Sequence, residues 1–246
     1  MIQIENLSKS FGPVPVLRDV SLEIREGETF AVIGRSGSGK SVLLKHLIGL
    51  LRPDGGRVLI DGTDPNELVY DDLRRLRRKF GVLFQGGALF DSMTALENVT
   101  FPLQTFARQS RAENLERARW CLDVVGLPDV GPKKPNELSG GMQKRVALAR
   151  AIALEPKYIL YDEPTSGLDP QTSETINRLI VHLADTLGAT SIVITHDMHS
   201  VLAIADRAGY LYEGRMHWVG TMEDLHCCAD ETTLDFVKAS EYTIGR

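Results

Sequence analysis

Apolar residues along the chain alternate between the short runs typical of strands and the three-to-four-residue period of helices. The β-rich runs predict strands over Val20–Ile24, Thr29–Ile33, 57–60 and 80–84, and again in YILYDEP and SIVITHD. Helical spacing predicts helices in the run SVLLKHLIGLL and over about 112–125, 142–154 and 172–187. This alternation predicts an α/β fold with a mostly parallel sheet, whose ligands bind at the carboxyl ends of the strands.

Composition narrows the class of protein. Of the 246 residues, 43% are hydrophobic and 25% are charged, which suits a globular chain with a sizeable core. The net charge of -5 argues against nucleic acid as the main ligand, because phosphate backbones select basic surfaces. The opening residues lack the pattern of a secretory signal, and no window approaches the roughly 18 uninterrupted apolar residues of a membrane span. We therefore expect a cytoplasmic protein that reaches a membrane only through a partner.

A glycine-rich turn follows the strand Thr29–Ile33 and opens a helix. It satisfies G-x-x-x-x-G-K-[ST], which is a phosphate loop in this context, whereas a glycine turn with a chance lysine would rarely match both pattern and context. Its glycines let the backbone approach a phosphate, Lys40 neutralises phosphate charge, and the Ser41 hydroxyl is a ligand for Mg²⁺. The predicted binding residues of this loop are Gly34, Ser36, Gly37, Gly39, Lys40 and Ser41.

Polar side chains end three of the predicted strands. Asp162 and Glu163 follow the apolar run YILY. Asp162 would hold Mg²⁺ through its water shell, and Glu163 would polarise an attacking water. His196 ends SIVIT and would hydrogen-bond a γ-phosphate, while Gln85 ends GVLF and would reach both Mg²⁺ and the attacking water. Each of these residues alone would more often be a turn, cap or strand-end residue. Their order along one chain with a phosphate loop favours nucleotide chemistry.

The stretch LSGGM at 138–142 predicts a second anion site. Ser139, Gly140 and Gly141 precede a helical run, so backbone N–H groups and a helix N-terminus turn toward one point. One chain thus carries two phosphate-binding elements about a hundred residues apart.

These motifs together resemble the nucleotide-binding domain of ABC transporters. The phosphate loop is similar to Walker A, Gln85 to the Q-loop, LSGGM to the signature, Asp162-Glu163 to the end of Walker B, SGLD at 166–169 to the D-loop and His196 to the H-loop. The resemblance implies a P-loop NTPase (RecA-like) core with a parallel sheet, an N-terminal antiparallel β region and an inserted helical subdomain. We expect an ATPase domain over 1–220, with the core at about 1–86 and 156–220 and the helical subdomain at about 87–155, and a C-terminal extension over 221–246.

The same resemblance implies a homodimer that sandwiches two ATP molecules with Mg²⁺. The signature of one subunit would complete the partner's site, with Ser139 and Gly141 on the γ-phosphate and Asp169 in the D-loop. Phe11 looks like the aromatic residue that stacks on adenine, although a Phe here also suits core packing. Met142 stands where the family usually has glutamine, so a contact near the partner's nucleotide sugar is lost or is taken over by Gln143.

The segment GGALFDSMTALENVTFPL after Gln85, with LSGGM, resembles the ATPases of MCE-linked (Mla-type) phospholipid transporters. This implies an integral membrane permease, an MCE-domain protein and a small regulatory subunit as partners, at the cytoplasmic face of the inner membrane. Leu89, Phe90 and Met93 would line a groove for a permease helix or serve as core of the helical subdomain. The arginine-rich run LRRLRRKF would meet partner or lipid charges, or form a solvated helix face.

Other readings remain open at this point. Amino acids or lipoproteins are alternative cargoes. A nucleic-acid maintenance or translation ATPase usually has tandem cassettes or a long coiled-coil insertion, and this chain shows neither. A regulatory module that binds ATP without turnover is disfavoured by the intact Lys40, Asp162, Glu163 and His196.

Overall fold

The computed structural model describes residues 1–107 and 109–239. It divides into two compact units: Met1–Arg77 with the described residues from Thr190 onward, and Arg78–Ala189. The predicted C-terminal extension begins in the first unit, and its residues 240–246 lie outside the described residues. No helix in the described ranges is long and apolar enough to cross a membrane.

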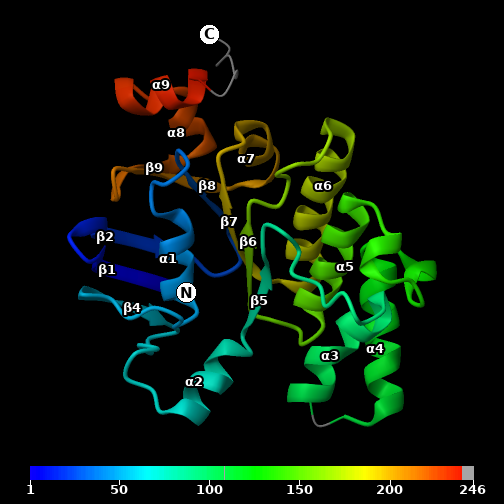
Figure 1. Ribbon diagram of the computed structural model, residues 1–246. Coiled ribbons are helices and arrows are strands. Elements are labelled where there is room, and N and C mark those ends of the chain that lie inside the picture. The colour runs from blue at the N-terminus through cyan, green and yellow to red at the C-terminus, as the bar shows by residue number, and fades with distance from the viewer. Residues whose placement is uncertain (108, 240–246) are drawn as a thin grey trace. The chain divides into compact units, whose positions relative to one another are not determined.

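The first unit holds an antiparallel sheet of three strands. β1 (Ile2–Phe11) lies between β2 (Val14–Ile24) and β4 (Gly55–Ile60), in the order β2-β1-β4. Figure 1 shows this sheet beside α1 (Lys40–Leu47), which packs against β2 and β4. The predicted N-terminal antiparallel β region is therefore confirmed.

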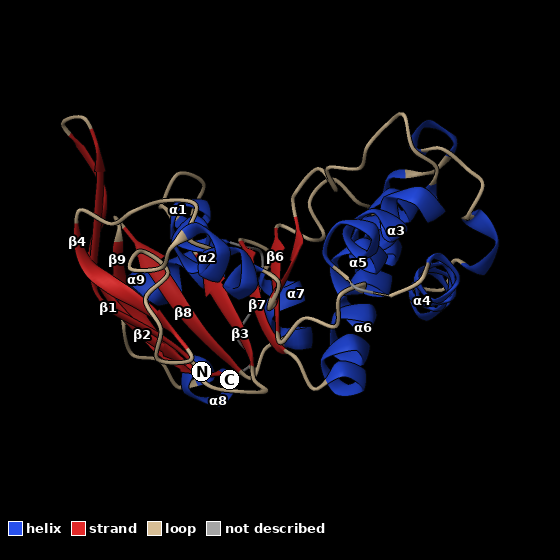
Figure 2. Cartoon of the chain, turned by 90° about the horizontal axis from the view of Figure 1, so that it is seen from below, coloured by secondary structure: helices blue, strands red, loops and turns tan. Residues whose placement is uncertain are grey.

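Parallel strands form the central part of the same unit. β3 (Thr29–Ile33) pairs in parallel with β7 (Thr190–Thr195) and with β8 (Arg207–Tyr212), and β9 (Arg215–Thr221) pairs antiparallel with β8 (Figure 2). All residues of β3 and β7 are buried, which explains why both read as continuous apolar runs in the sequence.

Four helices complete the first unit. They are α2 (Tyr70–Arg77), α7 (Met198–Ile204), α8 (Met222–His226) and α9 (Glu231–Ala239). Figure 1 shows α8 and α9 beside β8 and β9. Side chains of α7, α8 and α9 share one buried cluster with β3 and β8, so the C-terminal helices are part of the core of this unit.

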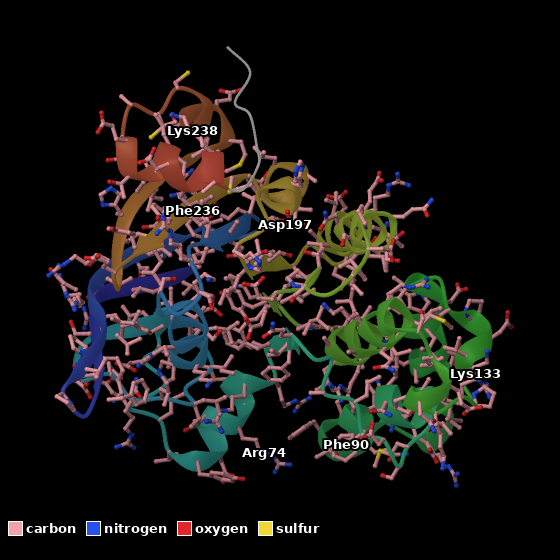
Figure 3. All side chains as sticks on the ribbon, turned by 45° about the horizontal axis from the view of Figure 1, so that its top comes forward. Arg74, Phe90, Lys133, Asp197, Phe236 and Lys238 are labelled. Carbon is pink, nitrogen blue, oxygen red and sulfur yellow. The ribbon has the colours of Figure 1, made fainter. Side chains whose placement is uncertain are left out.

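The arginine-rich run LRRLRRKF (73–80) contains both exposed arginines and one arginine that supports the fold. Arg74 and Arg75 are exposed on α2, with Arg74 labelled in Figure 3. Arg77 instead donates from Nε to the Ile48 carbonyl at 3.0 Å and from Nη2 to the Gly49 carbonyl at 2.8 Å. Arg77 therefore closes the end of the loop that follows α1.

The second unit pairs a short parallel β5 (Phe80–Leu83) and β6 (Tyr158–Asp162) with four helices. The helices are α3 (Ala95–Phe106), α4 (Arg111–Val124), α5 (Gly140–Ile152) and α6 (Pro170–Leu187). α3, α4 and α5 pack against one another, and α5 also contacts β5 and α6. The α/β fold class is confirmed, with parallel pairs β3–β7, β3–β8 and β5–β6 beside antiparallel pairs at β1–β2, β1–β4 and β8–β9.

Candidate nucleotide-binding site

Glycines shape the loop between β3 and α1 in the first unit. A Cβ on Gly34 would lie 2.5 Å from the Leu211 carbonyl oxygen, so the backbone approaches too closely for any side chain. Gly37 and Gly39 have φ angles of +80° and +105°, which side chains disfavour. A Cβ on Gly39 would also lie 2.9 Å from Leu17 Cδ2. The loop conformation therefore depends on glycine at these positions.

Two polar groups in this loop fit an anion. Lys40 is only 6% exposed, and its Nζ donates to the carbonyls of Gly34 at 2.7 Å and Arg35 at 3.0 Å. Ser38 Oγ is buried and has no hydrogen-bond partner within the described chain, although a buried hydroxyl usually has one. An ammonium and an unpaired hydroxyl beside a wound glycine backbone are the donor set that a phosphate needs. Ser36 and Ser41 are exposed at the same loop.

Phe11 and His196 also belong to the first unit. Phe11 ends β1 and is 48% exposed, so it does not pack in the core. Lys9 Nζ lies 5.8 Å from its ring centre. His196 is exposed directly after the buried strand β7, and Asp197 then begins α7 by accepting from the His199 backbone N–H at 3.0 Å. Figure 3 labels Asp197 at this turn.

Gln85, Asp162 and Glu163 lie in the second unit, where Gln85 follows β5 and Asp162 ends β6. Glu163 has a φ of +49°, a left-handed conformation that is uncommon for a residue with a side chain. Gln85 Nε2 donates to Ser166 Oγ at 3.4 Å. The structure thus joins the segment after β5 to the turn after β6 by a side-chain hydrogen bond.

Sequence reasoning overlooked Lys144, whose ammonium contacts this turn. Its Nζ donates to the backbone carbonyls of Ser166 at 2.6 Å, Pro164 at 2.9 Å and Glu163 at 3.4 Å. Burial lowers the pKa of Lys144, and the charge of Glu163 acts in the opposite direction. The sequence carried a signal for this role, because Lys144 is a charged residue among the apolar residues that form the buried face of α5. Lysine is rarely buried unless its ammonium has partners.

The signature segment forms the start of α5. Ser139 is the N-cap, and its Oγ accepts from the Met142 backbone N–H at 3.3 Å. A Cβ on Gly141 would lie 2.4 Å from Thr172 Cγ2, so glycine there permits close packing on α6. The Gln143 amide nitrogen donates to the carbonyls of Pro135 at 2.8 Å and Leu138 at 3.2 Å, so it braces its own segment. Gly140 is exposed.

Asp169 caps the next helix, α6. Its carboxylate accepts from the backbone N–H groups of Gln171 at 3.1 Å and Thr172 at 3.0 Å, and from the Thr172 hydroxyl at 2.6 Å. The hydrogen bonds from Thr172 hold the pKa of Asp169 below its usual range. The aspartate predicted in the D-loop therefore orients the start of the helix on which Gly141 packs.

The residues predicted to hold Mg²⁺ offer a hydroxyl, an amide and a carboxylate from Ser41, Gln85 and Asp162. These are hard oxygen donors, which fit Mg²⁺ bound together with phosphate oxygens. Over 1–107 and 109–239, the structure has no cluster of three or more His, Cys, Asp or Glu side chains that would hold a metal ion without phosphate oxygens as further ligands.

The apolar segment after Gln85 is partly exposed. Phe90 is 42% exposed, and its ring lies 4.9 Å from that of Phe101, which is also exposed. Asn98 is fully buried and fixes the loop through hydrogen bonds with both the N–H and the carbonyl of Phe90. Leu89 and Met93 are half-buried. Phe90 therefore belongs to the surface, whereas its two apolar neighbours contribute partly to packing.

Known proteins are similar in sequence to this chain. The family model described as ABC transporter matches residues 17–166. The probable ribonucleotide transport ATP-binding protein mkl of Mycobacterium leprae is 43% identical over 224 residues, covering 91% of this chain and 65% of that protein. The methionine import ATP-binding protein MetN of Carboxydothermus hydrogenoformans is 42% identical over 228 residues, covering 92% of this chain and 67% of that protein. The chain thus spans less than two thirds of the length of the mycobacterial relative.

A solved structure has the same architecture. The dimeric post-hydrolysis state of the ATP-binding cassette MJ0796, bound to ADP and Pi, matches with a TM-score of 0.83 and 39% identity. The match covers 90% of this chain and 99% of that one. This similarity confirms the predicted P-loop NTPase fold class.

Proposed function

We propose that this chain, which belongs to the ABC transporter family, drives a membrane permease that moves phospholipid between membranes. It is one of the ATP-hydrolysing cassettes of that family, with ATP and Mg²⁺ as its ligands. The observation that carries the cargo is the segment GGALFDSMTALENVTFPL, which resembles MCE-linked phospholipid ATPases. The exposed Phe90–Phe101 pair in this segment gives it an apolar surface suited to a permease helix.

The proposed assembly is a homodimer at the cytoplasmic face of the inner membrane. Two ATP molecules would lie between the phosphate loop of one subunit and the signature of the other, with an MCE-domain protein and a small regulatory subunit as further partners. The dimeric state of the similar cassette MJ0796 supports this arrangement. In the proposed assembly, the nucleotide-binding core of each subunit consists of residues 1–86 and 156–220. The helical subdomain is 87–155, and 221–246 is an extension.

Each predicted residue has a task in the proposed reaction, and Gln85 has two. Lys40, Ser36 and the glycines 34, 37 and 39 bind phosphates, Phe11 stacks on adenine, and Ser139, Gly140, Gly141 and Asp169 complete the partner's site. Glu163 accepts a proton from the attacking water, Gln85 orients that water, and His196 hydrogen-bonds the γ-phosphate. Ser41, Gln85 and Asp162 would hold Mg²⁺, which supplies charge neutralisation for the phosphates when bound.

Hydrolysis is tested with Glu163→Gln in the full chain. We expect steady-state turnover to fall by about 10²- to 10⁴-fold, the usual contribution of a positioned general base, while ATP binding is retained. Gel filtration with ATP should then show an accumulated dimer. Glu174→Gln, an exposed carboxyl on α6, is the matched control and should hydrolyse ATP like the wild type. Normal turnover in Glu163→Gln would remove this residue from the mechanism.

The cargo is tested by purifying the protein from its native membrane in mild detergent and identifying bound proteins and lipids by mass spectrometry. A permease with an MCE-domain protein and enriched phospholipid is the expected result. The MetN relative makes amino-acid import the second candidate. A permease with a soluble binding protein and no enriched lipid would favour that candidate and overturn the phospholipid proposal.

A further inference from the structure

Lys144 occupies a site with unusual chemistry in the second unit. It lies on α5, five residues after the signature residue Ser139, and is only 7% exposed. An ammonium carries three N–H donors. Its Nζ donates to the backbone carbonyls of Glu163, Pro164 and Ser166, which belong to a single turn. Lys144 thus binds a short stretch of main chain rather than a carboxylate.

That turn holds Glu163 in a conformation that needs support. The φ of +49° is disfavoured for a residue with a Cβ and persists where surrounding contacts enforce it. The Ser166 backbone N–H donates to the Glu163 carbonyl at 3.2 Å and closes the turn. Gln85 Nε2 reaches Ser166 Oγ at 3.4 Å. The contacts around this turn therefore involve the side chain of Gln85 and the main chain of Glu163, the two residues assigned to the attacking water.

The burial of Lys144 makes its three contacts mutually dependent. A buried ammonium is stable only when its donors are satisfied, and the carbonyls around it lose strong acceptor contacts if the charge is removed. Hydrogen bonds from a charged donor are shorter and stronger than neutral ones, as the 2.6 Å distance to Ser166 illustrates. The turn is consequently fixed against α5 more firmly than packing alone would fix it.

We propose that Lys144 is a positioning residue for ATP hydrolysis, which fixes the Glu163–Ser166 turn to the helix that begins at the signature. The inference rests on the proposed function, in which Glu163 accepts the proton of the attacking water. Because Ser139 caps the helix that carries Lys144, the contacts of Lys144 connect the helix that begins at the signature to the turn that carries Glu163. Lys144 itself contacts neither ATP nor water in this role.

The test is Lys144→Met in the full chain, which keeps the unbranched length and removes the charge. We expect kcat for ATP hydrolysis to fall by about 10- to 100-fold, because small displacements of a catalytic group cost rate on that scale. KM for ATP should stay within about twofold, since the phosphate loop belongs to the other unit. Because a partly unfolded sample would also lower the apparent kcat at an unchanged KM, kcat is expressed per molecule of protein that binds ATP, and an unchanged value on this basis would overturn the proposal.

Arg145→Met is the matched control. It removes one positive charge from the adjacent position of the same helix, where Arg145 Nη1 donates at 3.4 Å to the carbonyls of Val125 and Gly126, away from the Glu163 turn. We expect its kcat to stay near that of the wild type. An equal fall in both variants would show that charge on α5, rather than the contact with the turn, matters.

A double-mutant cycle shows whether Lys144 acts through Glu163. In single-turnover measurements, Lys144→Met should add no further loss to Glu163→Gln, because the group that it positions is already gone. Fully additive losses would overturn the proposal. If thermal melting shows that Lys144→Met does not fold, Lys144→Gln, which keeps an amide donor, takes its place in the same cycle.

The outcomes separate this inference from the proposed function. If the wild type does not hydrolyse ATP, or if Glu163→Gln turns over normally, the proposed function fails. If the wild type is active and Glu163→Gln is not, while Lys144→Met keeps a normal kcat, only the role of Lys144 fails.

Discussion

Phe236 is one of the buried side chains that fix the C-terminal helix α9 to the first unit. This side chain is 4% exposed, and its ring stacks on Tyr210 with a centroid distance of 4.7 Å. It shares a buried cluster with Ala31 and Ile33 of β3, the strand that leads into the phosphate loop. Phe236→Ala removes the ring and retains helix propensity, so it isolates the contribution of this contact.

The expected loss follows from burial and stacking. Truncation of a buried phenylalanine to alanine costs about 3–5 kcal/mol. Within that total, the stacked pair with Tyr210 accounts for about 0.5–1.5 kcal/mol. For a chain of 246 residues each kcal/mol lowers the melting temperature by about 2–4 °C. Phe236→Ala should therefore melt at least about 6 °C below the wild type.

Thermal melting followed by circular dichroism measures this loss, with Lys238→Ala as the matched control. Lys238 is exposed on the same helix, and both residues are labelled in Figure 3. The control should stay within about 0.5 kcal/mol of the wild type, as expected of a surface substitution. A melting temperature of Phe236→Ala within about 2 °C of the wild type would refute the reasoning, because the helix would then contribute no buried contact in solution.

Three further predictions concern pH, thiol reactivity and the signature. Burial lowers the pKa of His46, so below about pH 6.5 the unfolded chain binds the proton more readily and the free energy of unfolding decreases. The urea midpoint should therefore fall from pH 7 to pH 5 more steeply for the wild type than for His46→Leu. Equal slopes for the two proteins would contradict this. Burial raises the pKa of Cys121 to about 11, so iodoacetamide at about pH 8 should label the exposed Cys227 and spare Cys121 until the chain is unfolded, as peptide mass spectrometry would show. Ser139→Arg should abolish turnover and leave ATP binding to the phosphate loop intact; equal loss of both would point to misfolding.

The sequence predicted the buried strands of the fold most accurately. β3 matches its predicted range, because a continuous apolar run bounded by Gly27 and Gly34 leaves little freedom for its ends. α3 was overlooked although its start carries a capping box between Thr94 and Glu97. Pro102 inside this helix weakens the helical pattern that would otherwise have indicated it.

The candidate site was predictable where side chains carry the chemistry and unpredictable where the backbone does. Lys40 and Gly39 follow from a motif, because their residue types are required. The contacts of Lys144 do not, because its acceptors are main-chain carbonyls, which every residue type possesses. The capping role of Asp169 lies between these cases, since a helix start was predicted nearby but not at Pro170.

The use of main-chain acceptors by Lys144 has a consequence for variation of the sequence. Carbonyl oxygens persist when side chains change, so substitutions at Pro164 or Ser166 that keep the backbone path leave the ammonium fully bound. A carboxylate partner would instead have to be replaced together with the lysine. The turn beside Glu163 can therefore exchange side chains one at a time without loss of these contacts, whereas a change at position 144 removes all three together.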